Sequence, residues 1–75
     1  MIVKQLNDDW VEVGEMTMKI SAITAIRRPR VGYKGFDCKI GTFFHTVYDI
    51  SHEEAMQAYD DLLKICIEAG MGRCA

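Results

Sequence analysis

The chain has 75 residues, which is enough for one domain, and we place that domain at residues 1–75. Apolar residues make up 49% and charged residues 27%, a composition that excludes a disordered chain. Nine basic against eleven acidic residues give a net charge of −2, which disfavours a general nucleic-acid binder. Because so short a chain buries only about 60% of its unfolded surface, an additional source of stability is expected.

The cysteines and histidines do not supply that stability. Cys38, Cys66 and Cys74 are odd in number and contain no C-x-x-C pair, and His45 and His52 are not spaced to complete a zinc site with them. We therefore expect no disulfide framework, no metal and no cofactor. Cys38 and Cys66 lie on apolar faces and are expected in the core, whereas Cys74 is expected to be an exposed thiol. Oligomerisation is the remaining stabiliser.

No segment of the sequence reads as a membrane or export signal. The start of the chain lacks a basic stretch followed by a long apolar one, and no apolar run approaches the roughly 18 residues that a membrane span needs. We expect a cytoplasmic protein with no membrane partner.

The first part of the chain alternates in the manner of β-strands. Apolar residues recur at every second position in Trp10–Val13 and in Met16–Ile20, and Met1–Leu6 is β-prone. The turn-forming clusters at residues 7–9 and 14–15 separate these segments. All three are therefore predicted to be strands.

The central part continues the pattern around a charged connection. Residues 21–26 fit a strand with an irregularity, and residues 36–40 and 43–50 alternate again. Residues 27–35 contain the only proline, Pro29, and are expected to connect two antiparallel strands. The sequence predicts an antiparallel β-meander of four or five strands over about residues 1–50, either an open sheet or a half-open barrel.

One amphipathic helix is predicted at about residues 52–69. Ser51 and Glu54 have the spacing of a capping box, and Gly70 is a natural left-handed stop. The fold class is therefore α+β, a small meander with a C-terminal helix.

The apolar arc of this helix spans about 200°, twice the width of about 100° that one sheet requires. Two interpretations remain open: the strands curl around both flanks, or the flank formed by Met56, Leu63 and Ile67 packs against a second copy or another protein. The second interpretation predicts a homo-oligomer, in the first place a dimer.

Positive charge is concentrated in the connection. Arg27, Arg28, Arg30 and Lys34 lie within eight residues that contain no acid, and Tyr33 lies among them. Guanidinium groups bind phosphate or carboxylate in a bidentate manner, and a tyrosine ring can stack on a base. We predict a site for an anionic ligand, either a nucleotide or nucleic acid or an acidic protein surface; a merely solvated loop is the alternative.

The candidates for catalysis have structural explanations. Ser51 and His52 are neighbours in a helical first turn, where Ser51 caps the helix, and His45 reads as a structural histidine. Asp60 and Asp61 diverge by about 100° on a helix and cannot act as a couple. We therefore expect no enzyme.

The order of features has a resemblance to known small modules. An opening strand, Trp10–Val13, Ile23–Ile26, a charged hairpin and Tyr48–Ser51 leading into a helix resemble the β-meander-plus-helix modules of short phage-encoded accessory proteins. The build is also similar to that of small flagellar proteins of the FlbD type. The phage resemblance implies a stoichiometric inhibitor or ligand-sequestering protein in the host cytoplasm, often oligomeric, but it assigns no functional residue.

The sequence thus predicts a small, non-enzymatic, homo-oligomeric binding protein that engages its anionic ligand through the arginine-rich connection. The alternative is a structural adaptor that binds a partner protein through the exposed flank of its helix. The two differ in whether the arginines or the helix flank carry the binding.

Overall fold

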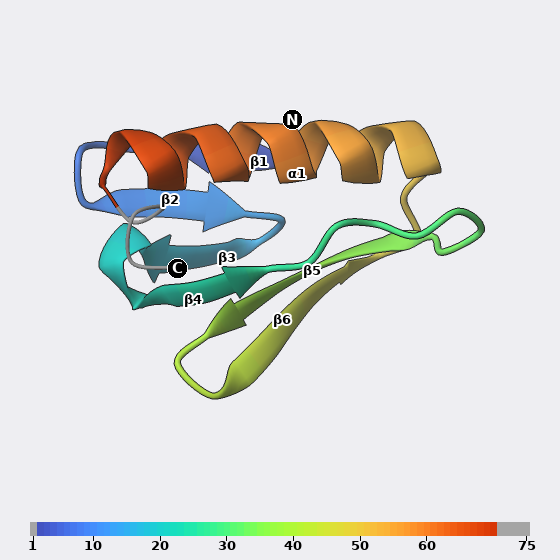
Figure 1. The fold of residues 1–75 in the computed structure, drawn as a ribbon, viewed down its shortest axis with the longest axis horizontal. Coiled ribbons are helices and arrows are strands. Elements are labelled where there is room, and N and C mark those ends of the chain that lie inside the picture. The colour runs from blue at the N-terminus through green and yellow to red at the C-terminus, as the bar shows by residue number, and fades with distance from the viewer. Residues whose placement is uncertain (1, 71–75) are drawn as a thin grey trace.

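The computed structural model describes residues 2–70, which form six strands, a short 3-10 helix and one α-helix (Figure 1). In chain order these are β1 (Val3–Gln5), β2 (Trp10–Val13), β3 (Met16–Lys19), η1 (Ile20–Ala22), β4 (Ile23–Ile26), β5 (Gly35–Ile40), β6 (Phe43–Tyr48) and α1 (His52–Glu68). The predicted α+β class, with antiparallel strands and a C-terminal helix, is confirmed.

Within residues 2–70 the strands form two open three-stranded sheets, ordered β1-β2-β3 and β4-β5-β6, and every pairing is antiparallel. The helix α1 lies across the first sheet, and the β5–β6 hairpin extends away from the rest of the molecule (Figure 1). The predicted meander is therefore interrupted between β3 and β4, where each sheet has an edge.

The interruption lies in the segment for which the sequence predicted an irregular strand. The 3-10 turn η1 separates the two sheets, and the N–H of Ile20 donates to the carbonyl of Asp9 at 2.8 Å. The register of β4 on β5 then shifts between Ile23 and Ala25. The hydroxyl of Thr24 donates to the carbonyl of Gly41 at 2.9 Å, which ties this bulge to the β5–β6 turn.

The two sheets approach each other at the β2–β3 turn. Gly14 has a φ of +63°, and a Cβ atom there would lie 2.9 Å from the Val47 side chain of β6. Next to it, Nε2 of His45 lies 2.9 Å from the Val13 carbonyl oxygen. The imidazole therefore links β6 to β2, which agrees with a structural role for His45.

The helix begins and ends as its sequence predicts. The hydroxyl of Ser51 accepts the N–H of Glu54 at 3.1 Å, and the Glu54 carboxylate accepts the N–H of Ser51 at 3.1 Å. Gly70, at φ +84°, follows the last turn. In the described part of the chain, no helix has the length and apolar character needed to cross a membrane.

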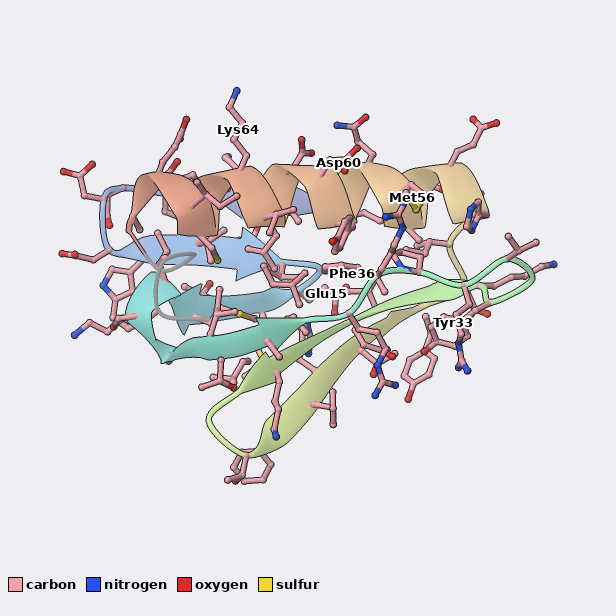
Figure 2. The ribbon with its side chains drawn as sticks, viewed as in Figure 1. Glu15, Tyr33, Phe36, Met56, Asp60 and Lys64 are labelled. Carbon is pink, nitrogen blue, oxygen red and sulfur yellow. The ribbon has the colours of Figure 1, made fainter. Side chains whose placement is uncertain are left out.

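The core lies between α1 and the inner faces of both sheets, and Phe36 points from β5 towards the helix (Figure 2). Both Cys38 and Cys66 are buried free thiols, as predicted, and Cys74 lies outside the described residues. Burial raises the pKa of Cys38 to about 11, with smaller contributions from Cys66 and Asp37. The other buried apolar residues are Val3, Val11, Val13, Met18, Ile20, Ile23, Ala55, Ala58 and Leu62.

Candidate functional site

The arginine-rich connection begins as a continuation of β4. The N–H of Arg27 donates to the carbonyl of Asp37 on β5 at 3.1 Å. The chain then turns, with the N–H of Tyr33 donating to the carbonyl of Arg30 at 3.1 Å and Gly32 at φ +88°. Pro29 is buried at the base of the turn. The prediction that this segment connects two antiparallel strands, β4 and β5, is therefore confirmed.

Asp37 is the anchor of this arrangement. Its side chain accepts the hydroxyl of Tyr33 at 2.8 Å and lies 3.6 Å from Nη1 of Arg27. The residue is only 7% exposed although it is charged, which requires such partners. The hydrogen bond to Asp37, with a smaller effect of burial, raises the pKa of the Tyr33 hydroxyl above its usual value near 10. One carboxylate thus orients two of the predicted site residues.

The position of Tyr33 also depends on Gly35, the first residue of β5. A Cβ atom on Gly35 would lie 3.0 Å from Cζ of Tyr33 and 2.9 Å from the Val47 carbonyl oxygen. Glycine therefore leaves room for the hydroxyl end of the Tyr33 ring at the start of β5. Figure 2 shows Tyr33 on the side of the molecule opposite to Asp60 and Lys64, which project from the far side of α1.

The face of the β4–β5–β6 sheet that points away from α1 is here called the outer face. Because successive side chains of a strand alternate, Asp37 and Lys39 lie opposite to the buried Phe36 on β5. Phe44 pairs with Lys39, and Tyr48 pairs with Gly35 at the other end of the strand. The residues of the outer face are Ala25, Arg27, Tyr33, Gly35, Asp37, Lys39, Phe44, Thr46 and Tyr48.

Two aromatic rings of β6 are exposed on this face. Phe44 is 55% exposed and Tyr48 is 72% exposed, and the four residue steps between them along the strand correspond to about 14 Å. Such exposure is unusual for large aromatic side chains, which normally lie in the core or in an interface. The outer face therefore offers two stacking surfaces to a ligand.

Cations lie against the aromatic rings. Cζ of Arg27 is 4.9 Å and Nζ of Lys39 is 5.7 Å from the centroid of the Phe44 ring. Cζ of Arg30 is 5.7 Å from the centroid of the Tyr33 ring. These are cation–π distances, and they place positive charge against the rings of Phe44 and Tyr33.

The structure brings together three of the five predicted ligand-binding residues, Arg27, Arg30 and Tyr33. Arg28 and Lys34 are exposed on the same connection, and neither forms an ion pair within residues 2–70. The solvated-loop alternative therefore describes these two better than the other three.

Sequence reasoning missed the strand residues of the site. The alternation had placed Phe44 and Tyr48 on one face of the same strand, but it did not show that this face points away from the core. The signal was available in β5, where the charged residues Asp37 and Lys39 alternate with the apolar residues of the inner face. Reading the two strands as a pair identifies the exposed face.

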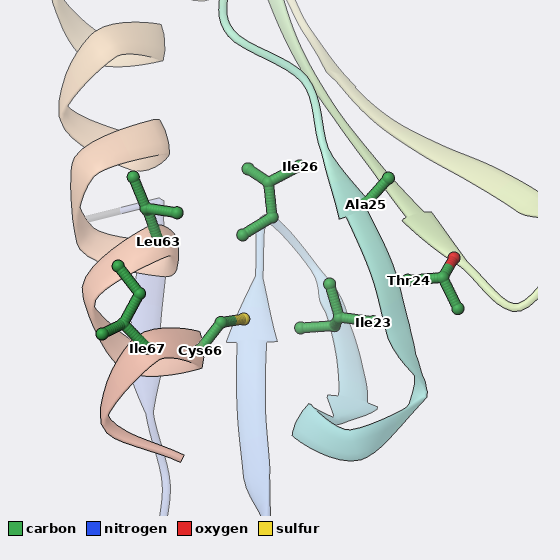
Figure 3. Close-up of a pocket in the computed structure, with 7 residues that line it drawn as sticks. All are labelled: Ile23, Thr24, Ala25, Ile26, Leu63, Cys66 and Ile67. Carbon is green, nitrogen blue, oxygen red and sulfur yellow. The ribbon is translucent and has the colours of Figure 1, made fainter. Parts of the chain in front are cut away.

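The predicted interface residues differ in exposure. Met56 and Leu63 are half-buried, whereas Ile67 is 55% exposed. Leu63 and Ile67 line an apolar groove between α1 and β4, but Met56 does not (Figure 3). The role of these residues in association stays a prediction.

The described residues hold no group of three His, Cys, Asp or Glu side chains placed to bind a metal ion. Ser51 is engaged as the helix cap, and His52 beside it is exposed. Comparisons of the chain with protein-family models, with curated proteins and with solved structures found no match. The resemblance to phage accessory and flagellar proteins therefore stays a prediction.

Proposed function

We propose that the protein binds single-stranded nucleic acid on the outer face of its β4–β5–β6 sheet. The observation that carries the proposal is the pair of exposed rings, Phe44 and Tyr48, on one sheet face, with Arg27 and Lys39 held against the ring of Phe44. Unpaired bases stack on aromatic rings, and cationic side chains contact the phosphates between them. This proposal moves the centre of the predicted anion site from the connection to the sheet.

The spacing of the rings suits a strand of nucleotides. Phe44 and Tyr48 are about 14 Å apart along β6, so they would stack bases that are not adjacent to one another. Tyr33 lies at the Tyr48 end of this track, where Gly35 and Tyr48 pair. The exposed side chains of Arg28, Arg30 and Lys34 extend the positive charge beyond that end.

The net negative charge of the chain does not oppose this proposal, because Asp37, the acid on the outer face, is engaged by Arg27 and Tyr33 and many of the other acids belong to the helix. Five of them belong to α1: Glu53, Glu54, Asp60, Asp61 and Glu68. The helix covers the inner side of the fold, and Figure 2 shows Asp60 pointing away from Tyr33. A nucleic acid on the outer face would be separated from these acids by the thickness of the sheet and the helix.

An acidic protein surface is the competing ligand, and the aromatic residues favour nucleic acid over it. A carboxylate-rich surface requires cations, but it gives no reason for two exposed rings on the same face. Stacking of a base contributes about 1–3 kcal/mol per ring in single-strand binding proteins. The two ligand classes therefore differ in how strongly they depend on Phe44 and Tyr48.

Binding is tested by fluorescence anisotropy with a labelled oligothymidylate, a labelled duplex and labelled polyglutamate. Phe44→Ala and Tyr48→Ala should each weaken oligothymidylate binding by about 5- to 150-fold. Phe43→Ala is the matched control, because Phe43 is 77% exposed on the same strand but points to the opposite face. Its affinity should equal that of the parent protein.

Salt dependence gives a second readout. The affinity for the single strand should fall with rising salt, with a slope of about 0.7 for each phosphate that a cation neutralises, and Arg30→Ala should reduce that slope. Absence of oligothymidylate binding would refute the proposal. Binding of polyglutamate that is insensitive to Phe44→Ala and Tyr48→Ala would assign the face to an acidic protein instead.

A further inference from the structure

An open apolar groove lies between β4 and the C-terminal half of α1 (Figure 3). Its volume is about 150 Å³, and Cys66 extends into it from the helix while Ile23 and Ile26 extend from the strand. Leu63 and Ile67 complete the helix side. The groove thus runs along one edge of the β4–β5–β6 sheet and along the least buried apolar flank of the helix.

The strand at this groove, β4, has one edge that pairs with no other strand within residues 2–70, and the bulge between Ile23 and Ala25 interrupts that edge. β4 is the first strand of its sheet, and its sequence Ile-Thr-Ala-Ile has neither charge nor proline. The N–H of Arg27 donates to β5, and neighbouring residues of an antiparallel strand bond on opposite sides, so the peptide groups of Ile26 point to the free edge. Uncharged edges of this kind readily pair with another strand.

The two ends of β4 carry opposite charge. Beyond its last residue the chain continues into Arg27 and Arg28, and Arg28 has no ion pair in the described part of the chain. At its first residue lies a hollow lined by Asp8, Asp9, Ser21 and Ala69 together with Ile20. The C-terminal end of α1 is next to this hollow and adds the negative end of its dipole.

We propose that a second copy of this chain covers the groove, with the two β4 strands paired antiparallel about a two-fold axis at Ala25. Antiparallel pairing places the basic end of each strand at the acidic end of the other. In this register Thr24 of one copy faces Ile26 of the other, and Arg28, which follows the end of β4, comes near the start of the other β4 and the acidic hollow beside it. Charge complementarity with itself identifies the occupant as a second copy.

The pairing also covers the groove. Ile67, which is 55% exposed, and the half-buried Leu63 lie beside the free edge, where the second copy's β4 and helix flank would shield them. The two sheets would join into one sheet of six strands, ordered β6-β5-β4-β4-β5-β6. This assembly does not depend on nucleic-acid binding, and its test contains no oligonucleotide.

Sedimentation equilibrium provides the test. The parent protein should show twice the chain mass of 8.5 kDa, and Arg28→Glu or the double variant Asp8→Lys/Asp9→Lys should each weaken the dimer at least about tenfold. Mixing the two variants should restore the dimer, because both contacts of the mixed dimer pair opposite charges. Arg30→Glu is the control: it makes the same charge change, but Arg30 is held against Tyr33 on the outer face.

Ile67→Asp gives an independent check on the groove. Circular dichroism should show the parent helix content, because the side chain is more than half exposed, while sedimentation should show a monomer. A parent protein that stays monomeric at every concentration would overturn the proposal. The antiparallel β4 register would be overturned if Arg28→Glu and Asp8→Lys/Asp9→Lys left the dimer affinity unchanged. It would also be overturned if the mixture of the two variants stayed monomeric.

Discussion

Replacing Gly35 with alanine tests how the outer face is built. The added methyl group would lie 2.9 Å from the Val47 carbonyl oxygen and 3.0 Å from Cζ of Tyr33, both closer than carbon atoms normally approach. Gly35 is not among the positive-φ glycines, so the backbone itself accepts alanine. Overpacking of this kind costs about 1–3 kcal/mol, and the preference of strands for alanine over glycine offsets about 0.5–1 kcal/mol.

We therefore expect Gly35→Ala to reduce the free energy of unfolding by roughly 1–2 kcal/mol. For a domain of this size each kcal/mol corresponds to a fall in Tm of about 4–8 °C. Urea denaturation followed by circular dichroism and by Trp10 fluorescence measures the loss. Because the methyl group also displaces the Tyr33 ring from Asp37, the pKa of Tyr33 should return towards its usual value in a spectrophotometric titration.

Gly41→Ala is the control for that experiment. Gly41 has a φ of +60°, but no atom lies within 4 Å of the added methyl group, so the substitution strains the backbone at the hairpin tip alone. It should cost about 1–2 kcal/mol and leave the titration of Tyr33 unchanged. Equal stability of Gly35→Ala and the parent protein, with an unchanged Tyr33 titration, would refute the packing of Tyr33 on Gly35.

Three further predictions concern stability and are checked by denaturant unfolding. Ser51→Ala removes the helix cap and should cost about 1 kcal/mol, so an unchanged unfolding midpoint would contradict the capping role. Leu62→Ala leaves a cavity at a fully buried site and should cost about 2–5 kcal/mol; a loss below 1 kcal/mol would contradict its place in the core. Burial raises the pKa of Cys38 from 9.0 to about 11, so the folded state retains the proton that the unfolded chain loses, and stability should fall between pH 9 and 11. Cys38→Ala should flatten that fall, and an equal fall in both proteins would assign it to other groups.

The helix could be predicted closely because its determinants are local. Ser51 and Glu54 form their capping box with each other, and Gly70 adopts its left-handed conformation immediately after the last turn. The buried residues Ala55, Ala58, Leu62 and Cys66 follow the helical period. None of these features requires knowledge of which strand lies beneath.

The division into two sheets could not be predicted from alternation. The 3-10 turn at Ile20–Ala22 depends on a hydrogen bond from Ile20 to Asp9 and on the approach of Gly14 to Val47, both of which join segments distant in sequence. Local pattern shows only that the segment is irregular. The direction in which the chain leaves the turn is set by packing, and this is why one meander became two open sheets.

The candidate site was predicted in part for the same reason. The charge cluster at Arg27–Lys34 is visible in sequence, but its arrangement depends on Asp37, which follows the cluster on the next strand and reaches back to Arg27 and Tyr33. An acid in a strand otherwise predicted as core gave no sign of this role. The exposure of Phe44 and Tyr48 follows only when β6 is paired with β5, whose alternating charged and apolar residues distinguish the outer face from the core face.

The two proposals use different surfaces of the β4–β5–β6 sheet, so each can hold without the other. Stacking requires the outer face of β5 and β6, whereas dimerisation requires the free edge of β4. Arg27 and Arg28 are consecutive, and Arg27 lies on the outer face against Phe44, whereas alternation directs Arg28 to the opposite side of the sheet, the side of Ile26 and the groove. A two-fold dimer would align two outer faces on one continuous sheet, so an oligonucleotide long enough to reach both should bind more tightly than one that occupies a single face, by the effective concentration of the second site. Loss of this length dependence in Ile67→Asp, with retained binding of the short oligonucleotide, would show that the edge and the face act separately.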